Sequence, residues 1–212
     1  MAEEIMNIQE MEVEDQTKVL IGIHKKSDNT KLAVTTDEYS NYDKRSWALD
    51  GIIIRNEDND VDFLFASSEK LCTFGIGPED IPESDKRRKN APVSPSFNEL
   101  DGYMCTQYQL ANHPDTHEEG CAICEAVKFG WLPSNGELNT IIERKDKFNE
   151  VAEACGASLF SGSLYSSSTQ YDKDYMWCFN TESGNFEFWH SKATQMSMRA
   201  VKSASDYEKV VE

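Results

Sequence analysis

The sequence predicts an α+β fold, with two main helices packed on short antiparallel strands that are joined by long loops. Three observations lead to this prediction. Paired apolar runs separated by polar turns occupy the first third of the 212-residue chain. Helix-capping patterns, each followed by apolar residues at helical spacing, occupy the middle. Aromatic-rich stretches of strand length, joined by short turns, occupy the last third.

Two hairpins are expected in the β-rich part that spans residues 17–74. Residues 18–24 (KVLIGIH) and 31–36 (KLAVTT) form the first hairpin, with a polar turn at 27–29. Residues 51–54 and 61–66 form the second hairpin, joined by the acidic connector 56–60.

A capping box at Thr116-His117-Glu118-Glu119 predicts the start of the first main helix, because the threonine and the glutamate exchange hydrogen bonds with free backbone N–H groups. The residues that follow place one apolar face at helical spacing: Gly120, Ile123, Cys124 and Val127. Gly130 stands where a glycine commonly ends a helix.

A second capping box, Ser134-Asn135-Gly136-Glu137, opens the second main helix. Its apolar face consists of Leu138, Ile141, Ile142, Phe148, Val151, Ala152 and Cys155. A break is expected near residues 145–146, and Gly156 ends the helix.

Antiparallel strands are expected at residues 175–181, 185–190 and 196–202, with a turn at 182–184. Because strand faces alternate, inward-facing Trp177 and Phe179 would leave Cys178 and Asn180 facing outward. Phe186 and Phe188 would likewise face the core and leave Glu187 and Trp189 exposed. The irregular pattern around Arg199 predicts a bulge or a bend there.

Three segments are expected to lie outside this core. Residues 1–16 are acidic and form an arm that orders on a partner or stays disordered. Residues 75–100 carry Pro78, Pro82, Pro92 and Pro95 around a basic run at 86–89, which predicts a long excursion over the surface. Residues 205–212 form a C-terminal tail.

The composition excludes several classes of function. A formal net charge of -17, from 21 basic and 38 acidic residues, argues against nucleic-acid binding through phosphates. No apolar run has the length of a membrane helix, so no membrane contact is expected. The first 16 residues lack the basic start and apolar core of a signal peptide. Six unevenly spaced cysteines are expected to be mostly reduced and buried, which suits assembly in a cytoplasm.

Three landmarks follow one another in the second half of the chain. The first is the run Gly130-Trp131-Leu132-Pro133-Ser134-Asn135-Gly136-Glu137-Leu138. The second is Ser167-Ser168-Thr169, followed by Trp177, and the third is Met198-Arg199-Ala200-Val201. Their order and spacing resemble the bacterial and phage branch of the C-type-lectin fold, which includes the variable proteins of diversity-generating retroelements and relatives of formylglycine-generating enzymes.

The resemblance covers residues 101–202 and extends more weakly over 18–67, which implies a C-type-lectin-like core at 101–204. Two positions depart from the family pattern: Ser166 stands where the family has tryptophan, and Gln170 stands where it has glutamate. The segment 163–201 is rich in aromatic and small polar residues, which favours a binding face over a buried core.

In retroelement-diversified relatives the variable positions cluster in the segment that matches 165–196. The resemblance therefore implies these ligand-binding candidates: Tyr165, Ser166, Tyr171, Tyr175, Cys178, Asn180, Glu187, Trp189 and His190. Adenine-directed diversification of the family's usual codons does not yield Glu, Lys, Met or Trp. Lys173, Met176, Glu187 and Trp189 thus argue against active diversification, and leave binding untouched.

Other chemistries find weaker support. His113, His117, Cys121 and Cys124 are of types that bind zinc, although Pro114 and the cap at Thr116 place His113 outside the helix. Calcium-dependent sugar binding lacks its ligands, because Cys178 and Phe179 follow Trp177. Oxidase chemistry needs paired cysteines, and His190 shows no catalytic partner in the sequence. No enzyme activity and no cofactor are expected.

The sequence therefore predicts a ligand-binding or display protein, such as a phage receptor-binding or host-adhesion component in a tail or fibre. Its partners would be a protein or glycan on a target cell and, through residues 1–16, other virion proteins. A homo-oligomer is left open. The alternatives are a structural virion decoration or assembly protein, and display on a bacterial cell surface by a route without a signal peptide.

Overall fold

The computed structural model describes most of the chain as a mixed α+β protein with two sheets and five helices. The described residues are 19–57, 60–73, 100–112, 121–170, 175–188, 190, 193–210. The expected acidic arm at 1–16, most of the proline-rich excursion and the capping box at 116–119 lie outside these residues. The chain divides into a first unit (1–68, 144–159 and 203–212) and a second unit (69–143 and 160–202).

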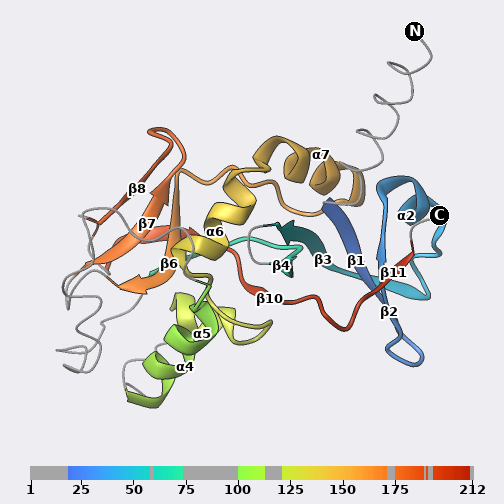
Figure 1. Cartoon of the computed structure of the whole chain (residues 1–212), viewed down its shortest axis with the longest axis horizontal. Coiled ribbons are helices and arrows are strands. Elements are labelled where there is room, and N and C mark those ends of the chain that lie inside the picture. The colour runs from blue at the N-terminus through green and yellow to red at the C-terminus, as the bar shows by residue number, and fades with distance from the viewer. Residues whose placement is uncertain are drawn as a thin grey trace, which may run out of the picture. The chain divides into compact units, whose positions relative to one another are not determined.

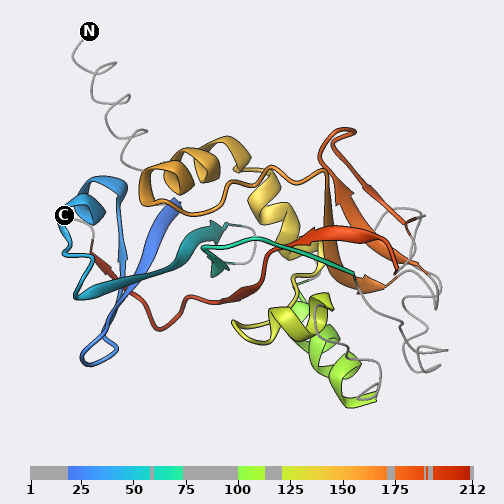
Figure 2. The same cartoon turned by 180° about the vertical axis from the view of Figure 1, so that it is seen from behind.

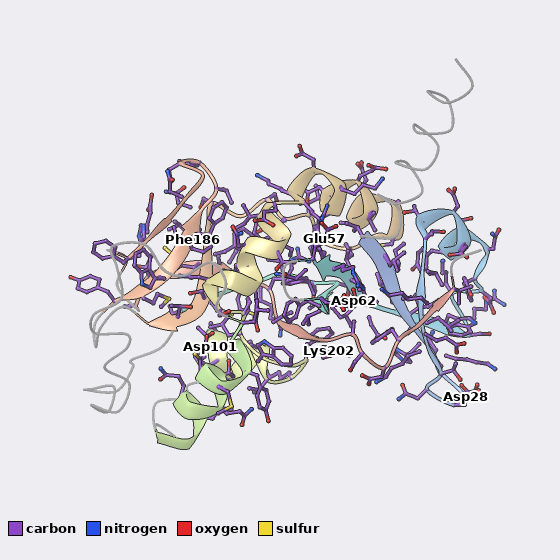
Figure 3. All side chains as sticks on the ribbon, viewed as in Figure 1. Asp28, Glu57, Asp62, Asp101, Phe186 and Lys202 are labelled. Carbon is purple, nitrogen blue, oxygen red and sulfur yellow. The ribbon has the colours of Figure 1, made fainter. Side chains whose placement is uncertain are left out.

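The first unit holds most of the six-stranded sheet, whose strand order is β10-β4-β3-β1-β2-β11, where β10 is Val201–Ser203 and β11 is Glu208–Val210. Its N-terminal strands are β1 (Val19–Lys25), β2 (Lys31–Val34), β3 (Trp47–Asn56) and β4 (Val61–Ala66). β1 pairs antiparallel with β2, and β3 pairs antiparallel with β4. Both predicted hairpins are therefore confirmed, and Asp28, labelled in Figure 3, lies in the turn of the first.

Two helices belong to this unit. The short α2 (Thr36–Asn41) begins with an unpredicted capping box. The Glu38 N–H donates to the Thr35 hydroxyl, and the Thr35 N–H donates to the Glu38 carboxylate. The longer α7 (Lys145–Cys155) buries Phe148, Val151 and Ala152 and packs on β1 and β3 (Figure 1). Gly156 ends α7 at a φ of 76°, as the sequence predicts, because glycine adopts the left-handed region at little cost.

The predicted tail at 205–212 is wrong, because residues 208–210 of this segment form an edge strand of the sheet. The strand β11 (Glu208–Val210) pairs parallel with β2. Before it, the Ala204 N–H donates to the Asp62 carbonyl (2.9 Å), and the Tyr207 hydroxyl donates to the Asp50 carboxylate (2.7 Å). Figure 2 shows β11, in red near the C-terminus, beside the blue N-terminal strands of this sheet.

The second unit is built on the five-stranded sheet β5-β9-β6-β7-β8. Its strands are β5 (Lys70–Thr73), β6 (Leu164–Gln170), β7 (Met176–Asn180), β8 (Asn185–Glu187) and β9 (Gln195–Met198). β6 and β9 are parallel, whereas the other neighbouring pairs are antiparallel. The helices α4 (Gly102–Asn112) and α6 (Asn135–Ile142) pack against β6, and α5 (Ala122–Ala126) packs against α4.

The expected second helix is present as two helices, with its break close to the predicted position. α6 ends at Ile142 and belongs to the second unit, whereas α7 starts at Lys145 and belongs to the first. The expected first helix is represented among the described residues by the five residues of α5. Five elements have no counterpart among those predicted from the sequence: α2, α4, β5, β6 and β11.

The irregularity predicted around Arg199 separates two strands, β9 and β10 (Val201–Ser203). Val201 exchanges backbone hydrogen bonds with Trp131, at 2.8 and 3.0 Å. Gly130 precedes this contact because a Cβ there would collide with the Val201 carbonyl oxygen. This close approach explains the glycine, whose φ is not in the left-handed region.

Within the described residues, no helix has the length and apolar character needed to cross a membrane.

Candidate functional site

The strand β6 holds the Ser167-Ser168-Thr169 run inside the second unit, so the expectation that this run belongs to a binding face is wrong. All three side chains are buried. The Ser167 hydroxyl donates to the Trp177 carbonyl of β7 (2.9 Å), and the Ser168 N–H donates to the Pro133 carbonyl (2.7 Å). These bonds replace water for backbone groups that the fold buries, and the Ser167 side chain supplies one of them.

The loop before α6 is tied to the same strand. The Asn135 N–H donates to the Thr169 hydroxyl at 3.0 Å, and Ser134 caps the helix through the predicted box with Glu137. The first two landmarks of the sequence are therefore in direct contact, and each satisfies polar groups of the other. Their spacing has a structural cause that needs no ligand.

Glu137 lies at the centre of this junction with 1% of its surface exposed. Its carboxylate accepts hydrogen bonds from the Ser134 N–H (2.8 Å) and from the Trp131 indole N–H (3.1 Å). Gly102 at the start of α4 leaves room for it, because a Cβ there would meet the Glu137 carboxylate. Burial raises the pKa of Glu137 to about 7, against the hydrogen bonds that favour the ionised form.

Tyr165 and Ser166 are also buried, with exposed fractions of 0% and 1%. The Tyr165 ring stacks on Phe160 with their centroids 3.8 Å apart, and its hydroxyl donates to Glu69. The Arg199 guanidinium, itself fully buried, lies 3.3 Å from the same carboxylate. Tyr165 and Ser166 face the interior of this fold, so the prediction that either side chain contacts a ligand directly is wrong.

The turn of the β7–β8 hairpin brings three of the predicted residues together. Glu187 accepts hydrogen bonds from the His190 imidazole (2.9 Å), the Asn180 amide (3.0 Å) and the Ser183 hydroxyl (3.0 Å). Although burial acts to raise it, these donors together lower the pKa of Glu187. The predicted exposure of Glu187 is wrong, since 6% of its surface is exposed. His190, for which the sequence suggested no partner, has one three residues before it.

Cys178 lies opposite Glu187 on the neighbouring strand and has no exposed surface. Its predicted outward orientation is wrong, because every residue of β7 except the last is buried and simple alternation fails. Burial and the Glu187 charge raise the pKa of Cys178 to about 12. A thiol with this pKa is protonated at neutral pH, and Cys178 has no exposed surface at which a reagent could meet it.

An aromatic cluster forms on the hairpin. Trp177 and Phe179 are buried, and their rings contact Phe188 and Phe186 at centroid distances of 5.2 and 5.3 Å. Phe186, labelled in Figure 3, and Phe188 are half-buried. Trp177 and Phe179 are buried, as predicted, whereas Phe186 and Phe188, which were predicted to face the core, are half-buried.

Tyr175 precedes this cluster in the chain and is 39% exposed. We define the β7–β8 surface as five of the accessible residues at this hairpin: Tyr175, Asn180, Phe186, Phe188 and His190. Tyr171 and Trp189, two further candidates, lie outside the described residues.

The four candidate zinc ligands are only partly described. Cys121 and Cys124 flank the first turn of α5, and His113 and His117 lie outside the described residues. Within the described part of the chain, no group of three or more histidine, cysteine, aspartate and glutamate side chains has the arrangement of a metal site.

Comparison with known proteins gives one informative likeness. No family model matches the chain, and no curated protein matches it. Among solved structures, the fold is similar to that of a fimbrial protein from Bacteroides ovatus, with a TM-score of 0.51 and 12% sequence identity. The match covers 66% of this chain and 35% of the fimbrial protein, so the chain spans about a third of that protein's length.

Proposed function

We propose that this chain is a non-enzymatic display protein that binds a protein or glycan target through the β7–β8 surface. The observation that carries the proposal is the exposure of Tyr175 beside a hairpin whose buried polar groups are hydrogen-bonded to one another. A tyrosine on a rigid support gives a large contact area at little entropic cost. The ordered turn at Glu187 presents Asn180 and His190 on the same hairpin.

The setting that we propose is a surface appendage of a bacterium. The fold similarity to a fimbrial protein supports it, and a display or adhesion role suits such a setting. The phage tail or fibre expected from the sequence is the second setting. The C-type-lectin-like topology of the second unit is part of the same proposal, and the contact between the 130–138 run and the 167–169 run supports it.

A binding measurement with purified full-length chain tests the role of the surface. Tyr175→Ala should weaken binding to target cells by about 2 kcal/mol, or roughly 30-fold, if this ring is an anchor of the interface. Met104→Ala is the matched control, because Met104 is a large apolar residue on α4 with 66% of its surface exposed. Unchanged affinity in Tyr175→Ala, Tyr171→Ala and Trp189→Ala would place the binding site elsewhere.

The second candidate function is a structural or assembly subunit of the same kind of appendage, and the fimbrial likeness favours it. In that case Tyr175→Ala should disturb incorporation into the appendage and leave cell binding unchanged. Removal of residues 1–16 addresses attachment separately. If the acidic arm attaches the chain to its particle, truncation abolishes incorporation while the domain remains folded.

A further inference from the structure

Three of the six cysteines lie together in the second unit. Cys72 is on β5, and Cys121 and Cys124 lie at the start of α5. Thr73 forms an isolated parallel bridge with Cys121, which holds β5 beside the beginning of the helix. All six cysteines are free thiols in the structure, so this cluster is present in its reduced form.

Cys121 and Cys124 occupy the N-cap and N3 positions of α5, and the N-cap side chain caps the helix through its sulfur. Cys121 is the N-cap of α5, and its sulfur accepts a hydrogen bond from the Cys124 N–H at 3.2 Å. Ser134 and Glu137 occupy the same two positions of α6, where the Ser134 hydroxyl accepts from the Glu137 N–H at 3.4 Å. The side chains of these positions face each other, and the Cys124 thiol is accordingly hydrogen-bonded to Cys121.

This spacing also suits a covalent bond. Residues three apart at a helix start have Cα atoms about 5 Å apart. A disulfide accepts Cα separations of roughly 4.4–6.8 Å. Closing the bond therefore needs side-chain rotation and no rearrangement of the backbone.

We propose that Cys121 and Cys124 form a reversible disulfide by exchange with a small-molecule disulfide such as glutathione disulfide. The Cys124 thiolate attacks one sulfur of the small disulfide, which forms a mixed disulfide and releases one small thiolate. The Cys121 thiolate then attacks the Cys124 sulfur, closes the Cys121–Cys124 bond and releases the second small thiolate. The two cysteines lose two electrons and two protons, and the small disulfide becomes two thiols.

The order of these steps follows from exposure. Cys124 is half-buried and accessible, whereas Cys121 and Cys72 are each 3% exposed. Burial and the hydrogen bond with Cys121 raise the pKa of Cys124 to about 12; the Glu125 charge adds to this, and the Lys128 charge opposes it. Because the thiolate is the attacking species, exchange is slow near neutral pH and faster in alkali.

The inference does not depend on the proposed binding function, since it uses residues outside the β7–β8 surface. The sequence predicted that the cysteines are mostly reduced. The Cys121–Cys124 pair would instead be oxidised wherever the protein meets an oxidising environment.

The test treats the reduced, full-length chain with glutathione disulfide at about pH 9, where thiolate is more abundant. After remaining thiols are alkylated, intact mass and peptide mapping identify the product. We expect a loss of about 2 Da that maps to a Cys121–Cys124 link and is reversed by reduced glutathione. Cys121→Ser retains a capping oxygen and should stop at a glutathione adduct on Cys124.

Two further variants separate this pair from its neighbours. Cys72→Ser and the control Cys178→Ser should both still form the link. A bond that maps to Cys72 and Cys121 would overturn the proposal. So would glutathione adducts without an internal bond, or an unchanged mass in a chain that circular dichroism shows to be folded.

Discussion

Glu137 offers a sharp test of the junction between α6 and the strand β6. Its carboxylate is buried among Ser134, Trp131 and the start of α4, and its pKa is raised to about 7 from an ordinary value of 4.5. The informative substitution is Glu137→Gln, because glutamine keeps the shape and an acceptor oxygen while it removes the titration.

The magnitude follows from the linkage between protonation and folding. Each pKa unit corresponds to about 1.4 kcal/mol, so a rise from 4.5 to about 7 corresponds to about 3 kcal/mol. The folded state binds the proton more tightly than the unfolded state. Below pH 4.5 both states are protonated and the group costs nothing. Between pH 4.5 and 7 the free energy of unfolding of the native chain falls as pH rises. Above pH 7 the whole loss of about 3 kcal/mol is present.

The assay is urea unfolding followed by tryptophan fluorescence, because Trp131 donates directly to Glu137 and reports on this junction. The free energy of unfolding of Glu137→Gln minus that of the native chain should rise by about 3 kcal/mol between pH 4 and 8. Any constant cost of the substitution cancels in this comparison across pH. Ser134→Ala, which removes the capping hydroxyl and keeps the carboxylate, should retain the native pH dependence.

Two results would refute the reasoning about Glu137. A difference that stays flat between pH 4 and 8 would show that the carboxyl group is not held in its protonated form by burial. A difference of the opposite sign would show that the hydrogen bonds from Ser134 and Trp131 outweigh burial and stabilise the ionised form.

Three other substitutions test the packing of the two units. Glu69→Gln removes the charge that faces the fully buried Arg199, so the free energy of unfolding in denaturant should fall by about 3–5 kcal/mol. A loss below about 1 kcal/mol would contradict the buried ion pair. Gly22→Ala places a Cβ 2.7 Å from Leu64 Cδ1, which should cost about 1–3 kcal/mol; an unchanged unfolding midpoint would mean that Leu64 yields freely. Tyr207→Phe removes a hydrogen bond to a β3 carboxylate and should cost about 2 kcal/mol with faster amide exchange in β11, whereas native exchange rates there would show that β2 alone holds the strand.

Local patterns explain which elements were predicted. The capping box of Ser134 and Glu137, the turn at 182–184 and the end of α7 at Gly156 each depend on residues within about one helical turn. The two N-terminal hairpins belong to the same group, because adjacent apolar runs pair across a short polar connector.

The candidate site was harder to predict because its residues are buried by partners far along the chain. The Ser167-Ser168-Thr169 run has the composition of a surface, yet its groups bond to Pro133, Asn135 and Trp177. Cys178 was expected to face outward, because alternation assumes one solvated face, and both faces of β7 are covered. A spacing of three residues between Glu187 and His190 was the available signal for that pair.

The sequence by itself determined the α+β class, the hairpins, the start of α6 and the end of α7, because propensities, caps and turns act between near neighbours. Only the tertiary structure decided which polar residues are buried, that residues 208–210 join the six-stranded sheet, and that Cys121 lies beside Cys72 as well as Cys124. These outcomes depend on which distant segments exclude water from one another. That information is absent from any local window of the chain.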